Sequence, residues 1–111
     1  MRLLLPLLGL ILIAMNAGPA YCTETPRFTL ILKNHQFIPS EIQVPANQKI
    51  ELRITNTDST PEEFESLDLH REKVVTGNQE ITVYVGPLQP GAYEFFGDFN
   101  PKMARGRLIA R

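Results

Sequence analysis

Residues 49–55 read KIELRIT, a strict alternation of polar and apolar side chains. In an extended chain, Ile50, Leu52 and Ile54 all point to one face, and the polar residues between them point to the other. Residues 80–85, EITVYV, repeat the same pattern. A period of two over six or seven residues indicates a β-strand with one buried face, so both segments favour a sheet protein.

Shorter β-forming segments lie on both sides of these two strands. We expect strands over residues 28–33, 36–38, 41–44, 92–96 and 107–110. Clusters of Asn, Asp, Gly and Pro lie between them, as in TDSTP at residues 57–61, and mark turns. One helical turn is expected over Glu62–Leu69, because Pro61 suits a first helical position. The whole pattern predicts an all-β protein, a Greek-key β-sandwich.

The first residues are typical of a targeting segment. Residues 1–20 read MRLLLPLLGLILIAMNAGPA, in which Arg2 precedes an apolar run and small residues follow it. The apolar run, residues 3–15, would span about 20 Å as a helix, which is short of a bilayer core of about 30 Å. We expect a signal peptide over residues 1–20, with cleavage as late as residue 22, followed by a single domain over residues 27–111. A lipid-modified Cys22 is the alternative. Export predicts a periplasmic protein.

Length and composition exclude several classes of function. The chain has 111 residues, a formal net charge of -1 and one Cys. The length suits one small domain, and the absence of a basic surplus argues against a nucleic-acid partner. A single Cys excludes an internal disulfide framework and a zinc site made only of Cys. A sandwich of this size offers little room for a cleft, so no small organic substrate is expected.

Two blocks of sequence carry a family resemblance. Residues 37–56, FIPSEIQVPANQKIELRITN, resemble the opening strands of cupredoxins, and residues 86–96, GPLQPGAYEFF, resemble the strand that leads into the cupredoxin copper loop. Blue-copper cupredoxins hold their metal with two His, one Cys thiolate and a weak axial Met. The resemblance therefore implies a cupredoxin-like sandwich and gives four positions at which to look for ligands.

At those four positions the residues have changed in three cases. The resemblance places Gly97 at the Cys position and Asn100 at the second His position, and Met103 keeps the axial Met position. Glu62 or Glu63 falls at the first His position. Because the intense blue centre depends on a copper–thiolate bond, the resemblance implies a site of another kind.

Three further segments resemble a narrower group. Residues 60–66 (TPEEFES), 71–75 (REKVV) and 95–99 (FFGDF) look like the cupredoxin-like proteins of periplasmic iron-uptake systems. That resemblance implies binding of copper, iron or both, and assistance in oxidising ferrous iron, with copper as electron acceptor. It implies an inner-membrane ferrous-iron permease or a periplasmic iron-binding protein as partner. A metal-binding or electron-transfer accessory protein fits this description better than a stand-alone enzyme.

The acidic run after Pro61 supplies candidate metal ligands. If Phe64 points into the core, alternation sends Glu63 and Glu65 together to the opposite face. Two carboxylates on one face repel each other unless they are solvated or bridged by a cation. A hard cation suits such oxygen ligands, and an added imidazole brings iron and copper(II) within range. The alternative is a solvated acidic edge that keeps the sheet from pairing with other chains.

The candidate set extends to the second loop. Asp98 would reach the acidic run if both loops lie at the same end of the sandwich, as the resemblance implies. His70 is the better placed of the two imidazoles, and Met103 would favour copper as an axial ligand. The alternatives are a surface role for His70 and a packing role for Met103, which are the more common roles of such residues. The candidate metal ligands are Glu62, Glu63, Glu65, Asp98, His70 and Met103.

Two functions remain open on the sequence. The first is a periplasmic metal-binding protein that holds copper or iron and serves ferrous-iron uptake. The second is a metal-free secreted interaction module that partners a membrane permease. The loss of the Cys and His ligand types favours the second, and the gathered carboxylates favour the first.

Overall fold

A computed structural model describes residues 2, 4, 9, 13 and 24–111 of the chain. Residues 24–111 contain strands and turns but no helix. The strands are β1 (Arg27–Lys33), β2 (Gln36–Ile38), β3 (Glu41–Val44), β4 (Ile50–Asn56), β5 (Glu62–Ser66), β6 (Arg71–Val75), β7 (Glu80–Val85), β8 (Gly91–Gly97) and β9 (Arg105–Ala110).

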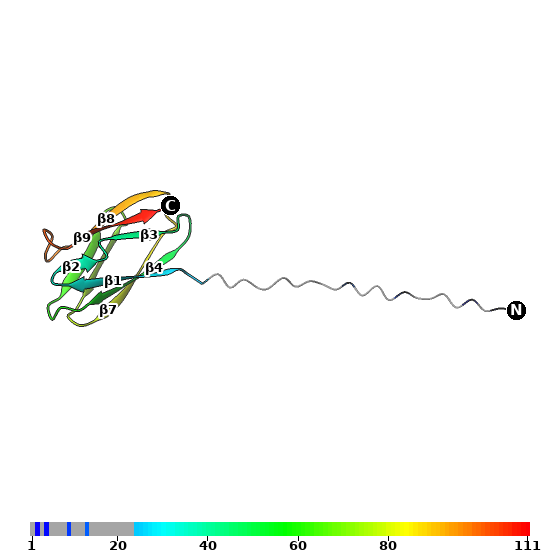
Figure 1. The fold of residues 1–111 in the computed structure, drawn as a ribbon, viewed down its shortest axis with the longest axis horizontal. Helices are drawn as coiled ribbons and strands as arrows, with labels where there is room; N and C mark the ends of the chain where they lie inside the picture. Colours follow the sequence, from blue (N-terminus) through cyan, green and yellow to red (C-terminus); the bar gives the residue numbers. More distant parts are fainter. Residues whose placement is uncertain (1, 3, 5–8, 10–12, 14–23) are drawn as a thin grey trace.

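The strands form two sheets that face each other (Figure 1). One sheet has the order β2-β1-β4-β7 and the other the order β3-β9-β8-β5-β6. Both sheets are mixed, because β1 pairs with β4 and β3 pairs with β9 in parallel, whereas the other pairs are antiparallel. The predicted all-β sandwich is confirmed. The alternating residues 49–55, from which a strand was predicted, correspond closely to β4.

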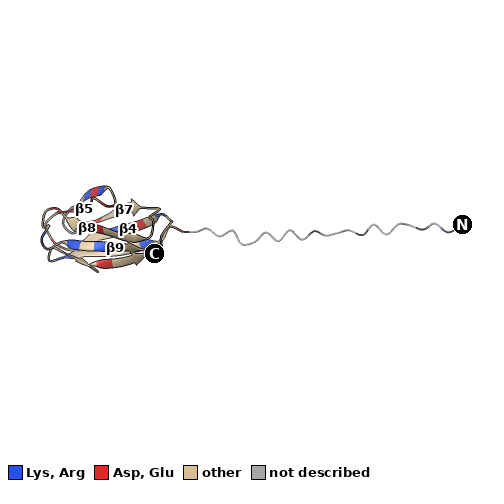
Figure 2. Cartoon of the chain, turned by 90° about the horizontal axis from the view of Figure 1, so that it is seen from above, with Lys and Arg blue, Asp and Glu red and all other residues tan. Residues whose placement is uncertain are grey.

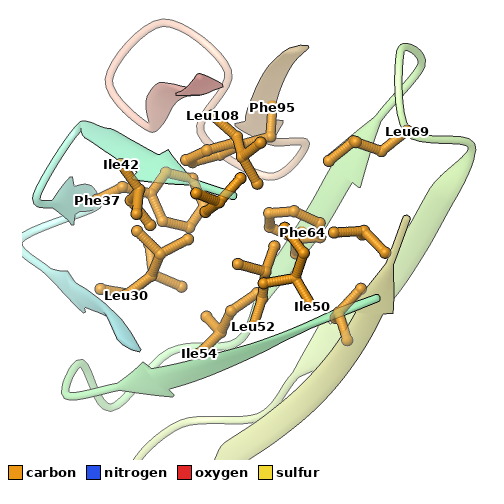
Figure 3. Close-up of a cluster of buried hydrophobic side chains, with 14 of the residues drawn as sticks. Leu30, Phe37, Ile42, Ile50, Leu52, Ile54, Phe64, Leu69, Phe95 and Leu108 are labelled. Atoms are coloured by element: carbon orange, nitrogen blue, oxygen red, sulfur yellow. The ribbon is translucent and has the colours of Figure 1, made fainter. Parts of the chain in front are cut away.

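The core lies between the two sheets (Figure 3). Ile50, Leu52 and Ile54 of β4 are fully buried, as their alternation predicted. Across from them, Phe64 and Phe95 pack with ring centroids 5.3 Å apart. Phe37 meets the Phe95 ring edge-on at 5.0 Å, so three aromatic rings from three strands join the sheets. Apolar burial of this kind, distributed along every strand, is what stabilises a small sandwich.

The expected helical turn over Glu62–Leu69 is wrong. Residues 62–66 form β5, whose burial alternates strictly so that Glu62, Phe64 and Ser66 face inward. The strand pairs with β8 on one side and with β6 on the other. Period-two alternation and two sets of ladder hydrogen bonds outweigh the weak helical signal of Pro61. Strand β6 was not predicted at all, because only Val75 of its five residues is buried.

Side chains of β6 cover the neighbouring edge of the other sheet. Arg71 Nε donates to the Tyr84 carbonyl oxygen at 2.9 Å, and Lys73 Nζ donates to the Thr82 carbonyl oxygen at 3.2 Å. Both acceptors belong to β7, the edge strand of the four-stranded sheet. Edge strands with satisfied carbonyls and nearby Lys or Arg are poor templates for pairing with another chain.

The predicted signal peptide, residues 1–20, and Cys22 lie outside the described residues, apart from four isolated positions in the former. Export and the cleavage position therefore stay predictions. Within the described part of the chain, no helix has the length and apolar character needed to cross a bilayer.

Candidate metal centre

Three carboxylates from two elements converge on the outer face of the five-stranded sheet. One ligand oxygen from each of Glu63, Glu65 and Asp98 lies within 4.8 Å of the others. Glu63 and Glu65 share this face because Phe64 between them is fully buried, as the alternation predicted. Asp98 follows the last residue of β8, and its amide N–H donates to the Glu63 carbonyl oxygen at 2.9 Å. That backbone bond extends the β5–β8 pairing to Asp98.

A fourth carboxylate, Glu72, borders the group. The β5–β6 register places Glu72 directly opposite Glu65, and Glu72 is one of the groups that raise the pKa of Glu63. The sequence analysis named residues 71–75 as part of the family resemblance but did not count Glu72 among the candidate ligands. The short turn at residues 67–70 could have indicated this, because a hairpin at that point places Glu72 beside the acidic run.

The crowding of negative charge changes the titration of the group. Partial burial, the hydrogen bond to Glu72 and the nearby negative charges raise the pKa of Glu63 to about 7. Burial and the charges of Asp98 and Glu72 also raise the pKa of Glu65. Among residues 24–111, the Lys–carboxylate and Arg–carboxylate ion pairs involve other acids, at Glu41, Glu51 and Glu80. A proton, solvent or a bound cation can relieve the repulsion here.

Charge is distributed unevenly over this sheet (Figure 2). Blue Lys and Arg segments mark β9, two strands away from the acidic β5 in the sheet order. Between them, the Phe96 ring of β8 lies beside Glu65 in the register and carries the Arg105 guanidinium 5.7 Å from its centroid. The outer face thus changes from acidic to basic across a single aromatic side chain.

Glu62, another predicted ligand, points the other way. Its side chain faces the interior and is 3% exposed. Its Oε1 accepts hydrogen bonds from the amide N–H groups of Phe99 at 2.8 Å and Glu63 at 3.0 Å, and its Oε2 accepts one from Asn100 Nδ2 at 2.8 Å. Glu62 is thus engaged with the loop between β8 and β9 and does not join the outer-face group.

The Glu62 carboxylate fills the space beside Gly97, the residue that the resemblance places at the Cys position. A β-carbon on Gly97 would lie 2.5 Å from Glu62 Cδ and 2.8 Å from Glu62 Oε1. Asn100, at the second His position, is held by the same carboxylate. The residues present here do not fit a blue-copper centre, because the space of the thiolate is occupied and an amide replaces the imidazole.

His70 and Met103 lie on the turn between β5 and β6 and on the loop between β8 and β9, respectively. His70 is exposed in the turn between β5 and β6, where it borders a shallow depression of about 190 Å³ together with Glu65 and Glu72. Met103 is 51% exposed on the loop between β8 and β9. Of the predicted ligands, the structure brings Glu63, Glu65 and Asp98 together, while Glu62 and His70 are not part of this group. Metal binding by any of them stays a prediction.

Comparison with known proteins places the fold in a family. The family model for the cupredoxin-like domain matches residues 5–110. This chain belongs to the cupredoxin-like domain family. A relative, an uncharacterized protein of Rickettsia prowazekii (strain Madrid E), is 49% identical over 80 residues. The match covers 72% of this chain and 64% of the relative, so the chain spans somewhat less than two thirds of that protein.

Solved structures show the same cupredoxin architecture. Auracyanin A of Chloroflexus aurantiacus, a "blue" copper protein, matches with a TM-score of 0.69 at 13% identity, over 79% of this chain and all of that one. Amicyanin of Paracoccus versutus matches with a TM-score of 0.61 at 16% identity, over 80% and 83% of the two chains. The metal-binding domain of a Cu(I)-exporting P-type ATPase of Streptococcus pneumoniae D39 gives 0.65 at 15% identity, over 77% and 84%. At such identities the likeness concerns the fold alone.

Proposed function

We propose that this chain is a periplasmic metal-binding protein that holds a copper or iron ion on the outer face of its five-stranded sheet. The convergence of Glu63, Glu65 and Asp98 within 4.8 Å carries the proposal. Small rotations of these side chains bring their oxygens onto one ion, and no described Lys or Arg forms an ion pair with them. The copper-protein relatives of the fold add support for copper, whereas iron rests on the chemistry of the oxygen donors alone.

The chemistry of the donors also indicates which oxidation state the site favours. Hard carboxylate oxygens bind a trivalent ion more strongly than a divalent one, because the interaction grows with charge. A site of this kind favours ferric over ferrous iron. If Glu63, Glu65 and Asp98 held the iron, they would stabilise the ferric product of a one-electron oxidation in which copper(II) is reduced to copper(I). The partner in iron uptake would be a ferrous-iron permease of the inner membrane or a periplasmic iron-binding protein.

Titration calorimetry tests the metal site directly. We expect copper(II), and iron(II) under anaerobic conditions, to bind the exported form of the chain, and we expect the double variant Glu63→Ala, Asp98→Ala to lose that binding. Glu94→Ala is the matched control, because Glu94 lies on β8 of the same sheet but outside the acidic group. A dissociation constant above about 100 μM for both metals, which corresponds to a binding free energy weaker than about 5.5 kcal/mol, overturns the proposal.

A second function has one observation in its favour. The buried Glu62 carboxylate holds the loop between β8 and β9 through hydrogen bonds, and Phe99 and Met103 of that loop are half-exposed. These features suit a metal-free interaction module that docks on a membrane permease through this loop. A complex with the permease that persists in chelator, and that is lost in a Phe99→Ser, Met103→Ser variant, would favour this function. Dissociation by chelator would exclude it.

A further inference from the structure

The loop that carries Asp98 is attached to β5 through one buried side chain. Glu62 accepts three hydrogen bonds, and two of them come from residues that directly follow Asp98, namely Phe99 and Asn100. The Asp98 amide itself donates to the Glu63 carbonyl oxygen at 2.9 Å. The backbone is therefore fixed immediately before and immediately after the Asp98 side chain.

Glu62 and Gly97 are complementary in shape. The Glu62 carboxylate occupies the space in which any side chain at residue 97 would begin, with Cδ only 2.5 Å from a β-carbon placed there. At 3% exposure the carboxylate has little contact with water, and the three donors around it are all neutral groups. Buried polar groups of this kind fix one conformation, because leaving a donor or acceptor unpaired is costly.

We propose that Glu62 is a positioning residue, whose buried carboxylate holds Asp98 against Glu63 and Glu65 so that the three outer-face ligands are already in place before an ion arrives. The inference rests on the proposed function. Glu62 lies next to Glu63 in sequence but on the opposite face of β5, so it acts on the site through the backbone rather than by touching the ion. Groups that orient metal ligands from behind commonly change affinity by about 10-fold to 100-fold when removed.

The test compares three variants of the exported chain by copper(II) titration calorimetry. Glu62→Ala removes all three hydrogen bonds and is expected to weaken copper(II) binding by about 10-fold or more. Glu62→Gln keeps an oxygen for the two amide donors, and the Asn100 amide can turn to meet the new NH₂ group, so this variant is expected to retain most of the affinity. Ser66→Ala is the matched control, since Ser66 is a buried polar residue on the same inward face of β5 whose hydroxyl partners, Leu69 and Glu94, lie away from the Asp98 loop.

A second readout separates positioning from general stability. In the metal-free protein, Glu62→Ala is expected to speed amide hydrogen exchange at Phe99, while Glu62→Gln and Ser66→Ala leave that amide protected. If Glu62→Ala fails to fold, Glu62→Gln is compared with Asn100→Ala instead. A loss of copper(II) affinity is then expected only for Asn100→Ala. Wild-type affinity in a folded Glu62→Ala protein, or an equal loss in Glu62→Gln and Glu62→Ala, overturns the positioning role alone. Failure of the wild-type chain to bind metal overturns the proposed function as well.

Discussion

Glu63 keeps its proton in the folded protein at a pH at which an unfolded glutamate has lost it. Partial burial and the hydrogen bond to Glu72 raise its pKa from 4.5 to about 7. Between these two values the folded state binds more protons than the unfolded state, so the stability contributed by this group is present at low pH and is lost as pH rises through about 7. We expect Glu63→Gln to unfold at a higher temperature than wild type at about pH 8 and at a similar temperature at about pH 4. Thermal unfolding followed by circular dichroism checks this, and a constant difference at every pH would contradict it.

Gly97 is predicted to tolerate no side chain. A β-carbon there would lie 2.5 Å from Glu62 Cδ and 2.7 Å from Ala104 Cβ, so Gly97→Ala must displace a buried carboxylate or the loop behind it. We expect a loss of about 1–3 kcal/mol in the free energy of unfolding, the usual cost of overpacking a filled interior. Urea denaturation measures it. Ala92→Gly on the exposed part of the same strand is the control, and a Gly97→Ala protein as stable as wild type would show that the interior is looser than described.

Residue-scale prediction from sequence depended on local alternation. Burial of Phe64 alone places Glu63 and Glu65 on one face, and the sequence predicted this correctly. The same alternation puts Glu62 on the inner face, but the three donors that hold it there include residues 99 and 100, far away in the chain. No spacing rule links position 62 to position 99, so the role of Glu62 became visible only when the sheet pairing was known.

Strand β5 has one face in the core and the other at the candidate site, and its central residue, Phe64, anchors it in the core. The Phe64 side chain is fully buried and packs 5.3 Å from the Phe95 ring, centroid to centroid. We expect Phe64→Ala to destabilise the protein by about 3–5 kcal/mol, the range for removing a buried aromatic ring. Phe99→Ala is the matched control, because Phe99 is 48% exposed and is expected to change stability by no more than about 0.5 kcal/mol. Urea denaturation of both variants compares them, and equal losses would contradict the assignment of Phe64 to the core.

The two strands with the clearest apolar period were predictable, and β6, which has none, was missed. Strands β4 and β7 alternate in sequence, and the expected ranges match the observed ones within a residue or two. Strand β6 exposes four of its five residues and is a strand because β5 supplies hydrogen bonds along its whole length. Its sequence, REKVV, carries no buried face from which to recognise it. Because β6 was not predicted, Glu72, which lies on it, was not recognised as a neighbour of the acidic group.

At the scale of the whole molecule, the proposed metal site, the protonation of Glu63 and the folded sheet all depend on the strands β5, β6 and β8. Because Glu63 must lose its proton to act as an ionic ligand, copper(II) competes with a proton whose pKa is about 7. An ion that binds only the folded state stabilises it by about 2.7 kcal/mol when its concentration is about 100 times its dissociation constant. We therefore expect copper(II) to raise the unfolding temperature of the exported chain, and to raise it more at about pH 8 than at about pH 5.5.

Differential scanning fluorimetry with and without chelator measures this shift in unfolding temperature. Asp98→Asn should abolish most of it while keeping the fold, and an equal shift in wild type and Asp98→Asn would mean that copper(II) acts at another part of the surface.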